Sequence, residues 1–151
     1  MAGWKRVEEI LAYQRSLELR DKVLALLDGG AIPRDFRLRD QISSAARSAP
    51  ANIAEGFDRY KHGQFGYQVG VAKASLAELG THLDEVRKRG LLSKKVLDDL
   101  FALTSDAYRL TNGLLRHLET TETPPPWLKA VARAAGITDS NVDSTSTEHE
   151  H

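Results

Sequence analysis

The sequence has no cysteine, few aromatic residues and no long apolar run. The absence of cysteine excludes a disulfide framework, thiol chemistry and a metal site built from thiolates. Aromatic residues make up only 7% of the chain, and alanine and leucine dominate the apolar positions, which favours an all-α fold. No apolar segment approaches the roughly 18 residues of a membrane span, and the first residues lack the apolar core of a secretory signal. We therefore expect a cytoplasmic protein with no membrane partner.

The chain also lacks net charge, because 21 basic residues balance 21 acidic ones. The charges are unevenly placed: residues 1–119 hold 19 basic and 16 acidic residues, whereas residues 120–151 hold 2 and 5. This mildly basic body with an acidic tail is far from the strongly basic composition of a dedicated nucleic-acid-binding domain. Charge alone therefore does not indicate a nucleic-acid partner.

Apolar residues recur three and four positions apart in four segments, which predicts four amphipathic helices. The segments cover about residues 7–27, 38–57, 65–89 and 93–118, and Ser93 is the expected N-cap of the last one. In a chain of 151 residues, four such helices joined by short loops predict an antiparallel up-down-up-down four-helix bundle over residues 4–119.

Each predicted helix has a stripe of residues that is expected to face the core. In the first helix the stripe is Ile10, Tyr13, Leu17, Leu24 and Leu27, with Leu19, Val23 and Leu26 beside it. The last two helices follow a strict heptad spacing, at Phe65, Val69, Ala72, Leu76, Leu79, Leu83 and Val86 and at Val96, Leu100, Leu103, Ala107, Leu110, Leu114 and Leu118.

The second predicted helix contains Pro50, within the stretch SAPANIAEG at residues 48–56. The apolar spacing continues unchanged from Leu38 to Phe57. This favours a single helix that is kinked or locally opened at the proline, although an interior proline costs about 3 kcal/mol. In the alternative, Ser48 caps a separate helix and Pro50 lies in its first turn.

Composition changes after Glu119, so residues 120–151 are expected to form a Pro-rich and polar tail. The segment TTETPPPW predicts extended, polyproline-like backbone. Residues 128–135 predict a short helix, and the rest of the tail is polar enough to be disordered.

Two stretches of the second and third predicted helices resemble a known family. QISSAARSAPANIAEGFDR (residues 41–59) and VAKASLAELGTHL (residues 71–83) are similar to the Q-x-x-x-A-x-S-I-P-x-N-I-A-E-G and A-x-G-S-L-x-E-L-E-T-Q-L motifs of the four helix bundle protein family. The founding members of that family are encoded in intervening sequences of bacterial 23S ribosomal RNA genes. The similarity covers about residues 4–119, with departures from the motifs at Ala49, Ala74, Gly80 and His82.

The resemblance implies a four-helix bundle that assembles as a homopentamer. It also implies similarity to the accessory proteins of diversity-generating retroelements, which are barrel-shaped pentamers that bind nucleic acid and a reverse transcriptase. We therefore expect an assembly whose partners are copies of itself, RNA or DNA, or another protein, and which is not a catalyst.

Polar residues in the matched stretches share helix faces. Buried polar groups must be paired, so these residues predict either a structural hydrogen-bond network around the proline or a site for a ligand or partner. We favour the structural network, and its members are Asn52, Glu55, Arg59, Ser75 and Glu78, with His82 on the same face as Glu78.

Small residues lie along a face of the third predicted helix that is distinct from its heptad stripe. Glycine inside a helix costs about 1 kcal/mol relative to alanine, so such a row predicts close approach to a neighbouring helix or a neighbouring subunit. We favour a subunit interface that includes Gly66, Gly70 and Ala77, with Lys73 and Gly80 on the same face.

In an up-down bundle the first and third loops lie at the same end, which would bring eight basic residues together. A pentamer would repeat this patch around a ring, and such a ring can bind phosphates by releasing counterions. Cations near a helix C-terminus also have a structural explanation, because they complement the helix dipole. The eight residues are Arg34, Arg37, Arg39, Arg87, Lys88, Arg89, Lys94 and Lys95.

The chain carries no phosphate-binding glycine loop, no dinucleotide fingerprint and no plausible nucleophile triad. Glu78 and His82 form only part of the carboxylate and histidine set of a di-iron bundle, because no second helix repeats the pair. We therefore expect a non-enzymatic, homo-oligomeric protein without a metal or cofactor. It would bind RNA, DNA or a nucleoprotein through the basic end; alternatively, it would be a protein-interaction scaffold that binds no nucleic acid.

Overall fold

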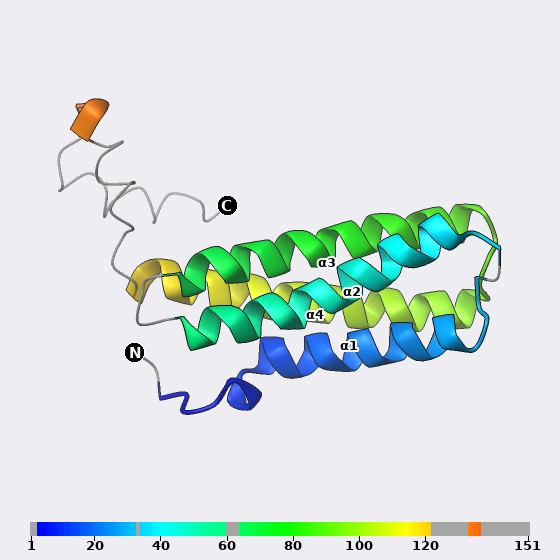
Figure 1. Cartoon of the computed structure of the whole chain (residues 1–151), viewed down its shortest axis with the longest axis horizontal. Helices are drawn as coiled ribbons and strands as arrows, with labels where there is room; N and C mark the ends of the chain where they lie inside the picture. The colour runs from blue at the N-terminus through cyan, green and yellow to red at the C-terminus, as the bar shows by residue number, and fades with distance from the viewer. Residues whose placement is uncertain (1–2, 33, 60–63, 122–132, 137–151) are drawn as a thin grey trace.

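The computed structural model describes residues 3–32, 34–59, 64–121 and 133–136 (Figure 1). These residues form a 3-10 helix and four α-helices and contain no strand, which confirms the predicted all-α class for this part of the chain. Of the predicted tail, residues 120–121 belong to the last helix and residues 133–136 are described, whereas the rest lies outside the described residues. The helices are η1 (Val7–Glu9), α1 (Leu11–Asp28), α2 (Phe36–Asp58), α3 (Phe65–Lys88) and α4 (Lys94–Thr121).

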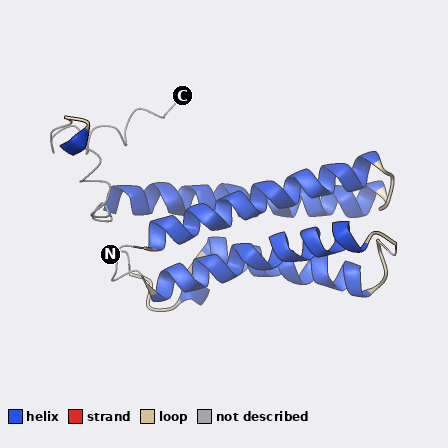
Figure 2. Cartoon of the chain, turned by 45° about the horizontal axis from the view of Figure 1, so that its top comes forward, coloured by secondary structure: helices blue, strands red, loops and turns tan. Residues whose placement is uncertain are grey.

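The four α-helices lie side by side, and each packs against two neighbours. The contacting pairs are α1 with α2, α2 with α3, α3 with α4, and α4 with α1; α2 and α3 share the most extensive contact. Chain direction alternates from one helix to the next, as the colours of Figure 1 show, and Figure 2 shows the same bundle after a rotation. The connections from α1 to α2 and from α3 to α4 therefore lie at the same end.

The heptad predicted for the third helix is confirmed by α3. All seven residues are buried, and α3 begins at the first of them. Phe65, Val69 and Ala72 pack in a core cluster at the end where α3 begins, whereas the residues from Leu76 to Val86 belong to a second cluster. The strict spacing thus identified the core face of α3 correctly because every position carries an apolar side chain.

In α4 the predicted core stripe is partly wrong. Leu100, Ala107, Leu114 and Leu118 are buried as expected, but three predicted positions are only half-buried, and the buried residues in the same turns follow each of them directly. The Thr104 hydroxyl is satisfied within the helix, because Thr104 Oγ1 donates to the Leu100 carbonyl at 2.7 Å. Thr111 Oγ1 is buried and has no hydrogen-bond partner among the described residues. The half-buried residues are Val96, Leu103 and Leu110, and the buried ones are Leu97, Thr104 and Thr111.

The first helix also differs from its prediction. A 3-10 turn precedes it, and Ile10 has extended backbone, so α1 begins at Leu11 and not near Val7. The Glu9 carboxylate accepts hydrogen bonds from the backbone N–H groups of Lys5 and Arg6, at 2.6 and 2.9 Å, and so stabilises the turn that interrupts the helix. The buried stripe of α1 is Ala12, Ser16, Leu19, Val23 and Leu27, whereas Tyr13, Leu17 and Leu24 are half-buried.

The helix α2 continues through Pro50, so the interpretation of one continuous helix is correct and the alternative with Ser48 as an N-cap is wrong. The N-cap of α2 is Asp35, whose side chain accepts a hydrogen bond from the Leu38 N–H at 2.9 Å. Pro50 itself is buried, so its ring adds apolar packing that offsets part of its cost to the helix.

The core consists of two apolar clusters that are separated by one small or polar buried residue on each helix. On α1, for example, Ala12 belongs to one cluster and Leu19 to the other, and Ser16 lies between them. Between α2 and α3 the helices are close enough for Ser48 Oγ to lie 2.7 Å from Ser75 Oγ. The four separating residues are Ser16, Pro50, Ser75 and Thr111.

Gly56, the last residue of SAPANIAEG, marks the closest approach of α2 to α3. A Cβ atom placed on Gly56 would lie 2.7 Å from Cβ of Gln68 and 2.9 Å from Cδ2 of Phe65. The Gln68 Cβ atom is bonded directly to the backbone, so a change of side-chain rotamer cannot move it away. The glycine is therefore required by the packing of α2 on the first turn of α3.

We expect Gly56→Ala to destabilise the protein by about 1–3 kcal/mol, because the added methyl group forces α2 and α3 apart. The free energy of unfolding, measured by urea denaturation with far-ultraviolet circular dichroism, checks this. Gly113→Ala in α4 is the matched control: its Cβ would meet nothing within 4 Å, and alanine is the better helix former by about 1 kcal/mol. Equal stabilities for the two variants would contradict the packing argument.

Candidate nucleic-acid interface

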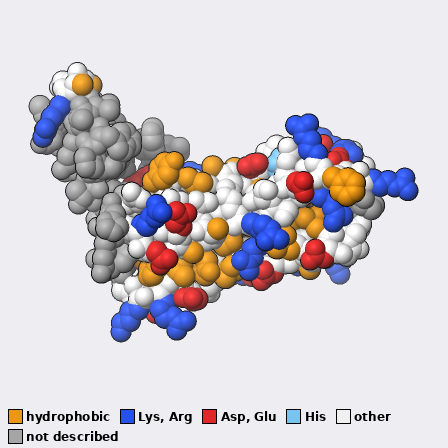
Figure 3. Space-filling view, viewed as in Figure 1, with side chains coloured by type: hydrophobic (Ala, Val, Ile, Leu, Met, Phe, Trp, Pro, Cys, Tyr) orange, Lys and Arg blue, Asp and Glu red, His pale blue; other side chains and the backbone are white. Residues whose placement is uncertain are grey.

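The loop end of the bundle is the end that holds the α1–α2 connection, residues 29–35, and the α3–α4 connection, residues 89–93. Cationic side chains project from this end in Figure 3, at the right of the view, with hydrophobic and acidic surface between them. All eight basic residues predicted for a nucleic-acid interface belong to these connections or to the adjoining helix turns. Five of them pair with other described residues, and three do not.

Asp35 joins the two connections of the loop end. Its carboxylate caps α2, and it also accepts a hydrogen bond from Arg89 Nη1 at 2.6 Å. Arg89 in turn lies 3.4 Å from Glu85 of α3. The bond from Arg89, followed by the backbone bond from Leu38, holds the pKa of Asp35 below its ordinary value, and the same pairing raises the pKa of Arg89.

Arg39 closes the C-terminal end of α1. Its Nη2 donates to the Leu27 carbonyl at 2.8 Å, and its Nη1 donates to the Ile32 carbonyl at 3.2 Å. Carbonyls at the end of a helix have no partner within the helix, so an arginine from α2 satisfies them here. Arg39 is half-buried and holds the first connection in place, which is a structural role and leaves little of its charge for a ligand.

Three further cations are paired with carboxylates on their own helices. Asp84 accepts contacts from Lys88, at 3.0 Å, and from Arg87. These two cations, Lys88 first, lower the pKa of Asp84. At the start of α4, Lys94 Nζ lies 2.7 Å from Asp98, which raises the pKa of Lys94. All three cations therefore have a carboxylate partner, but Arg87 and Lys88 share the single charge of Asp84.

The remaining three cations are exposed and have no ion pair or hydrogen bond with any described residue. Arg34 precedes the cap of α2, Arg37 lies in its first turn, and Lys95 lies in the first turn of α4. Phe36, between the two arginines, is 76% exposed. The sequence analysis overlooked Phe36, although an aromatic residue enclosed by arginines in the stretch RDFR was the available signal.

The loop end is close to neutral when its acidic residues are counted. Eight cations stand against seven carboxylates, so the loop end as a whole carries little net charge. Local charge matters more, because five of the cations are held by specific partners and three are not. The carboxylates counted are Asp28, Asp35, Asp40, Asp84, Glu85, Asp98 and Asp99.

A second set of predicted residues forms a hydrogen-bond chain between α2 and α3. Asn52 Nδ2 donates to both the carbonyl and the Oγ of Ser48, at 2.8 and 2.9 Å. Ser48 Oγ lies 2.7 Å from Ser75 Oγ, which donates to the Val71 carbonyl at 3.1 Å. Because each hydroxyl has one proton, the chain runs in a single direction from Asn52 to Val71, and Ser48 is the member that the prediction left out.

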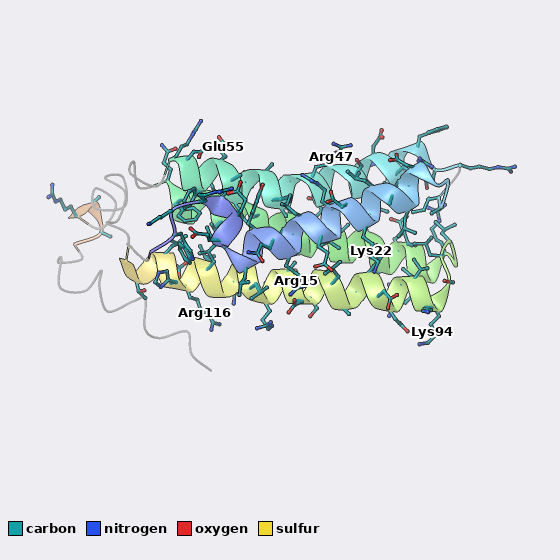
Figure 4. All side chains as sticks on the ribbon, turned by 90° about the horizontal axis from the view of Figure 1, so that it is seen from below. Arg15, Lys22, Arg47, Glu55, Lys94 and Arg116 are labelled. Atoms are coloured by element: carbon teal, nitrogen blue, oxygen red, sulfur yellow. The ribbon has the colours of Figure 1, made fainter. Side chains whose placement is uncertain are left out.

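The other predicted members of that network lie apart from it. Glu55 of α2 lies 3.2 Å from Arg59, four residues further along the chain. Glu78 of α3 lies 3.3 Å from His82, again four residues further along. Neither pair joins two helices. Glu55 lies towards the end of the bundle opposite Lys94 (Figure 4). Within the described residues no group of three or more histidine, aspartate and glutamate side chains lies close enough to hold a metal ion.

At two glycines of the predicted small-residue row, α3 makes no close contact with the part of the chain that the structure describes. A Cβ atom added to Gly70 or to Gly80 would meet nothing within 4 Å. Gly66 and Gly70 are half-buried, and Ala77 is exposed. Close approach to another helix of the same chain therefore does not explain Gly70 and Gly80; within the chain, that explanation applies to Gly56.

The described residues form an all-α protein of four packed helices. A comparison with protein families then identifies its family. Residues 8–113, which are more than half of the chain, match the family described as 23S rRNA-intervening sequence protein. The chain belongs to this family, as the resemblance of SAPANIAEG and its surroundings indicated. A search of curated proteins returned no match. No helix within the described ranges is both long and apolar enough to cross a membrane.

Asp35→Asn is expected to lower stability at neutral pH, because asparagine still caps α2 but cannot form the ion pair with Arg89. The folded-state pKa of Asp35 lies below the ordinary value of 3.8. The contribution is therefore complete above that value and is lost as the pH falls through the folded-state pKa. Urea denaturation of both proteins from pH 7 to about pH 2.5 should show a difference that shrinks below about pH 3.8.

Asp40→Asn is the matched control, because Asp40 is exposed on α2 and makes no ion pair or hydrogen bond with any described residue. Its stability should follow that of the wild-type protein at every pH. A difference between Asp35→Asn and the wild type that stays constant down to the lowest pH would contradict the role of the Asp35 charge.

Proposed function

We propose that this protein is a non-enzymatic, homo-oligomeric bundle that binds RNA or DNA through its loop end. The observation that supports this is the presence of three exposed cations, Arg34, Arg37 and Lys95, that form no ion pair or hydrogen bond with any described residue. At the same end, Arg39 and Arg89 hold the connections, and the other three cations are paired within their own helices. Phosphates can therefore pair with them without breaking an existing ion pair.

Two of the paired cations link the elements of this surface. Arg39 bonds the end of α1, and Asp35 with Arg89 joins the start of α2 to the end of α3. Contacts that already order a surface reduce the entropy that binding has to remove, so a few charges contribute more to binding. The nearly neutral overall charge of the loop end predicts modest affinity for each subunit.

Assembly would multiply that affinity. The family resemblance implies a homopentamer, and the alternating direction of the helices supports an antiparallel up-down-up-down bundle as its subunit. Five loop ends arranged around a ring would repeat the three unpaired cations in every subunit, and linked sites raise effective concentration. The proposed compartment is the cytoplasm.

The proposed subunit interface includes the outer face of α3 with Gly66, Gly70 and Ala77. Helical glycine costs about 1 kcal/mol relative to alanine, and no neighbour within the chain accounts for that cost at Gly70 or Gly80. Close approach by a helix of a second copy would account for it. The same observation favours the second candidate function, a scaffold that binds another protein through this face and binds no nucleic acid.

Removing the unpaired cations should weaken nucleic-acid binding and reduce its salt dependence. For Arg34→Ala, Arg37→Ala and Lys95→Ala we expect the slope of log K against log salt to fall by roughly 0.7–0.9 for each phosphate that the variant no longer neutralises. Fluorescence anisotropy with a labelled structured RNA and the corresponding DNA, between low and physiological salt, measures this. No binding by the wild-type protein at low salt would refute the proposed function and favour the scaffold.

Arg116→Ala is the matched control for charge. Arg116 is exposed and has no ion pair among the described residues, but it lies towards the opposite end of α4 (Figure 4). Its removal should leave the salt slope unchanged. Lys88→Ala, which removes a cation already paired with Asp84, should have a smaller effect than Arg37→Ala.

The wild-type protein should measure as five subunits by light scattering. Gly70→Leu should reduce the mass, because the side chain fits the open face of a single chain but blocks a second helix. Gly113→Leu on α4 is the control with equal space and should keep the wild-type mass. A wild-type monomer, or identical masses for all three proteins, would contradict the proposed interface.

A further inference from the structure

Phe36 is the most exposed large hydrophobic side chain among the described residues, at 76%, ahead of Tyr67 at 73% and Leu11 at 60%. Large apolar side chains on a surface are most informative when charged groups of one sign flank them, as Arg34 and Arg37 do here. We propose that the ring of Phe36 is a stacking platform for an unpaired nucleobase. The loop end then binds single-stranded loops of RNA or DNA in preference to continuous duplex. This inference rests on the proposed nucleic-acid-binding function.

The position of Phe36 is fixed before any ligand arrives. It is the first residue of α2, and the carboxylate of Asp35 beside it is bonded to the Leu38 N–H and to Arg89. The backbone around the ring is therefore held by contacts that do not involve the ring. Stacking on such a platform costs only the ordering of one side chain and of the base.

The arginines on either side of Phe36 can bind the phosphates of a single-stranded nucleic acid. Proteins that bind single strands combine aromatic platforms for the bases with cations that follow the phosphates. Arg34 and Arg37 are both exposed and have no ion pair or hydrogen bond to any described residue. A nucleotide whose base lies on Phe36 would have its phosphates within the reach of long side chains on either side.

An open groove includes both sequence neighbours of Phe36 and offers groups that can bond the edge of a base. The groove has a volume of about 370 Å³, and it is lined by Asp35, Arg37, Leu38, Gln41 and Glu85, whereas Phe36 itself is not a lining residue. The Gln41 amide forms no hydrogen bond with any described residue, so both its donor and its acceptor are available. Base edges are accessible to such groups in loops and bulges, where bases are not already paired.

Duplex and protein ligands fit this surface less well. In a continuous duplex both faces of each base are already stacked, so the ring of Phe36 has no partner there. A stable protein interface buries about 800 Å² on each side around several apolar anchors. Among the described residues of the loop end, Phe36 is the only exposed large hydrophobic side chain.

The test compares binding of an RNA hairpin with a single-stranded loop, a blunt RNA duplex of equal length and the corresponding DNAs. We expect the wild-type protein to prefer the hairpin. Phe36→Ala and Phe36→Leu should weaken hairpin binding by about 5- to 150-fold, the range for removal of one stacked base, and should leave duplex binding unchanged. Phe36→Trp should retain hairpin binding. A 2-aminopurine in the loop should be quenched by the wild-type and Trp proteins and not by the Leu variant.

Tyr67→Ala, which removes a comparably exposed aromatic ring on α3, is the matched control and should bind as the wild type does. Equal binding of hairpin and duplex, with no effect of Phe36→Ala, would overturn the stacking inference and leave nucleic-acid binding intact. A lower mass of Phe36→Ala in light scattering would also overturn it, because Phe36 would then be a subunit contact. The absence of binding to every nucleic acid would refute the proposed function itself, and the inference with it.

Discussion

The close approach of α2 to α3 is the constraint on which the rest of the bundle depends. Gly56 leaves no room for a Cβ atom against Gln68 and Phe65, and a short chain of hydrogen bonds joins Ser48 to Ser75 further along the same contact. Both features need small residues in α2. The stretch SAPANIAEG is thus explained by packing: Ser48 and Gly56 allow α2 to lie close to α3, and Ala49, Pro50 and Ile53 are buried.

This contact also governs what is presented at the loop end. Because α2 is fixed against α3, Asp35 at the start of one helix reaches Arg89 at the end of the other. That ion pair and the bonds of Arg39 to two carbonyls use charges for structure, whereas Arg34, Arg37 and Phe36 beside them are exposed. The loop end is a candidate binding surface because some of its cations have no ion-pair partner among the described residues, and not because it holds many cations.

Among the described residues, one polar network runs from Asn52 to the Val71 carbonyl, and each of its hydroxyl groups donates to another member of the network or to a carbonyl. This network therefore has a structural role between α2 and α3. Family membership in the 23S rRNA-intervening sequence proteins agrees with the four-helix fold. The proposed function places recognition on exposed groups repeated by assembly, which is why oligomeric mass and salt dependence are the informative measurements.

The sequence by itself determined the helical class, the approximate ends of the helices, the core face of α3 and the continuity of α2 across Pro50, because all of these follow from periodic apolar spacing. It did not determine the core face of α4, where Thr104 and Thr111 are buried in place of Leu103 and Leu110. Nor did it distinguish paired cations from free ones. Those outcomes depend on which side chains from distant segments meet, as Asp35 and Arg89 do, and only the tertiary structure decides that.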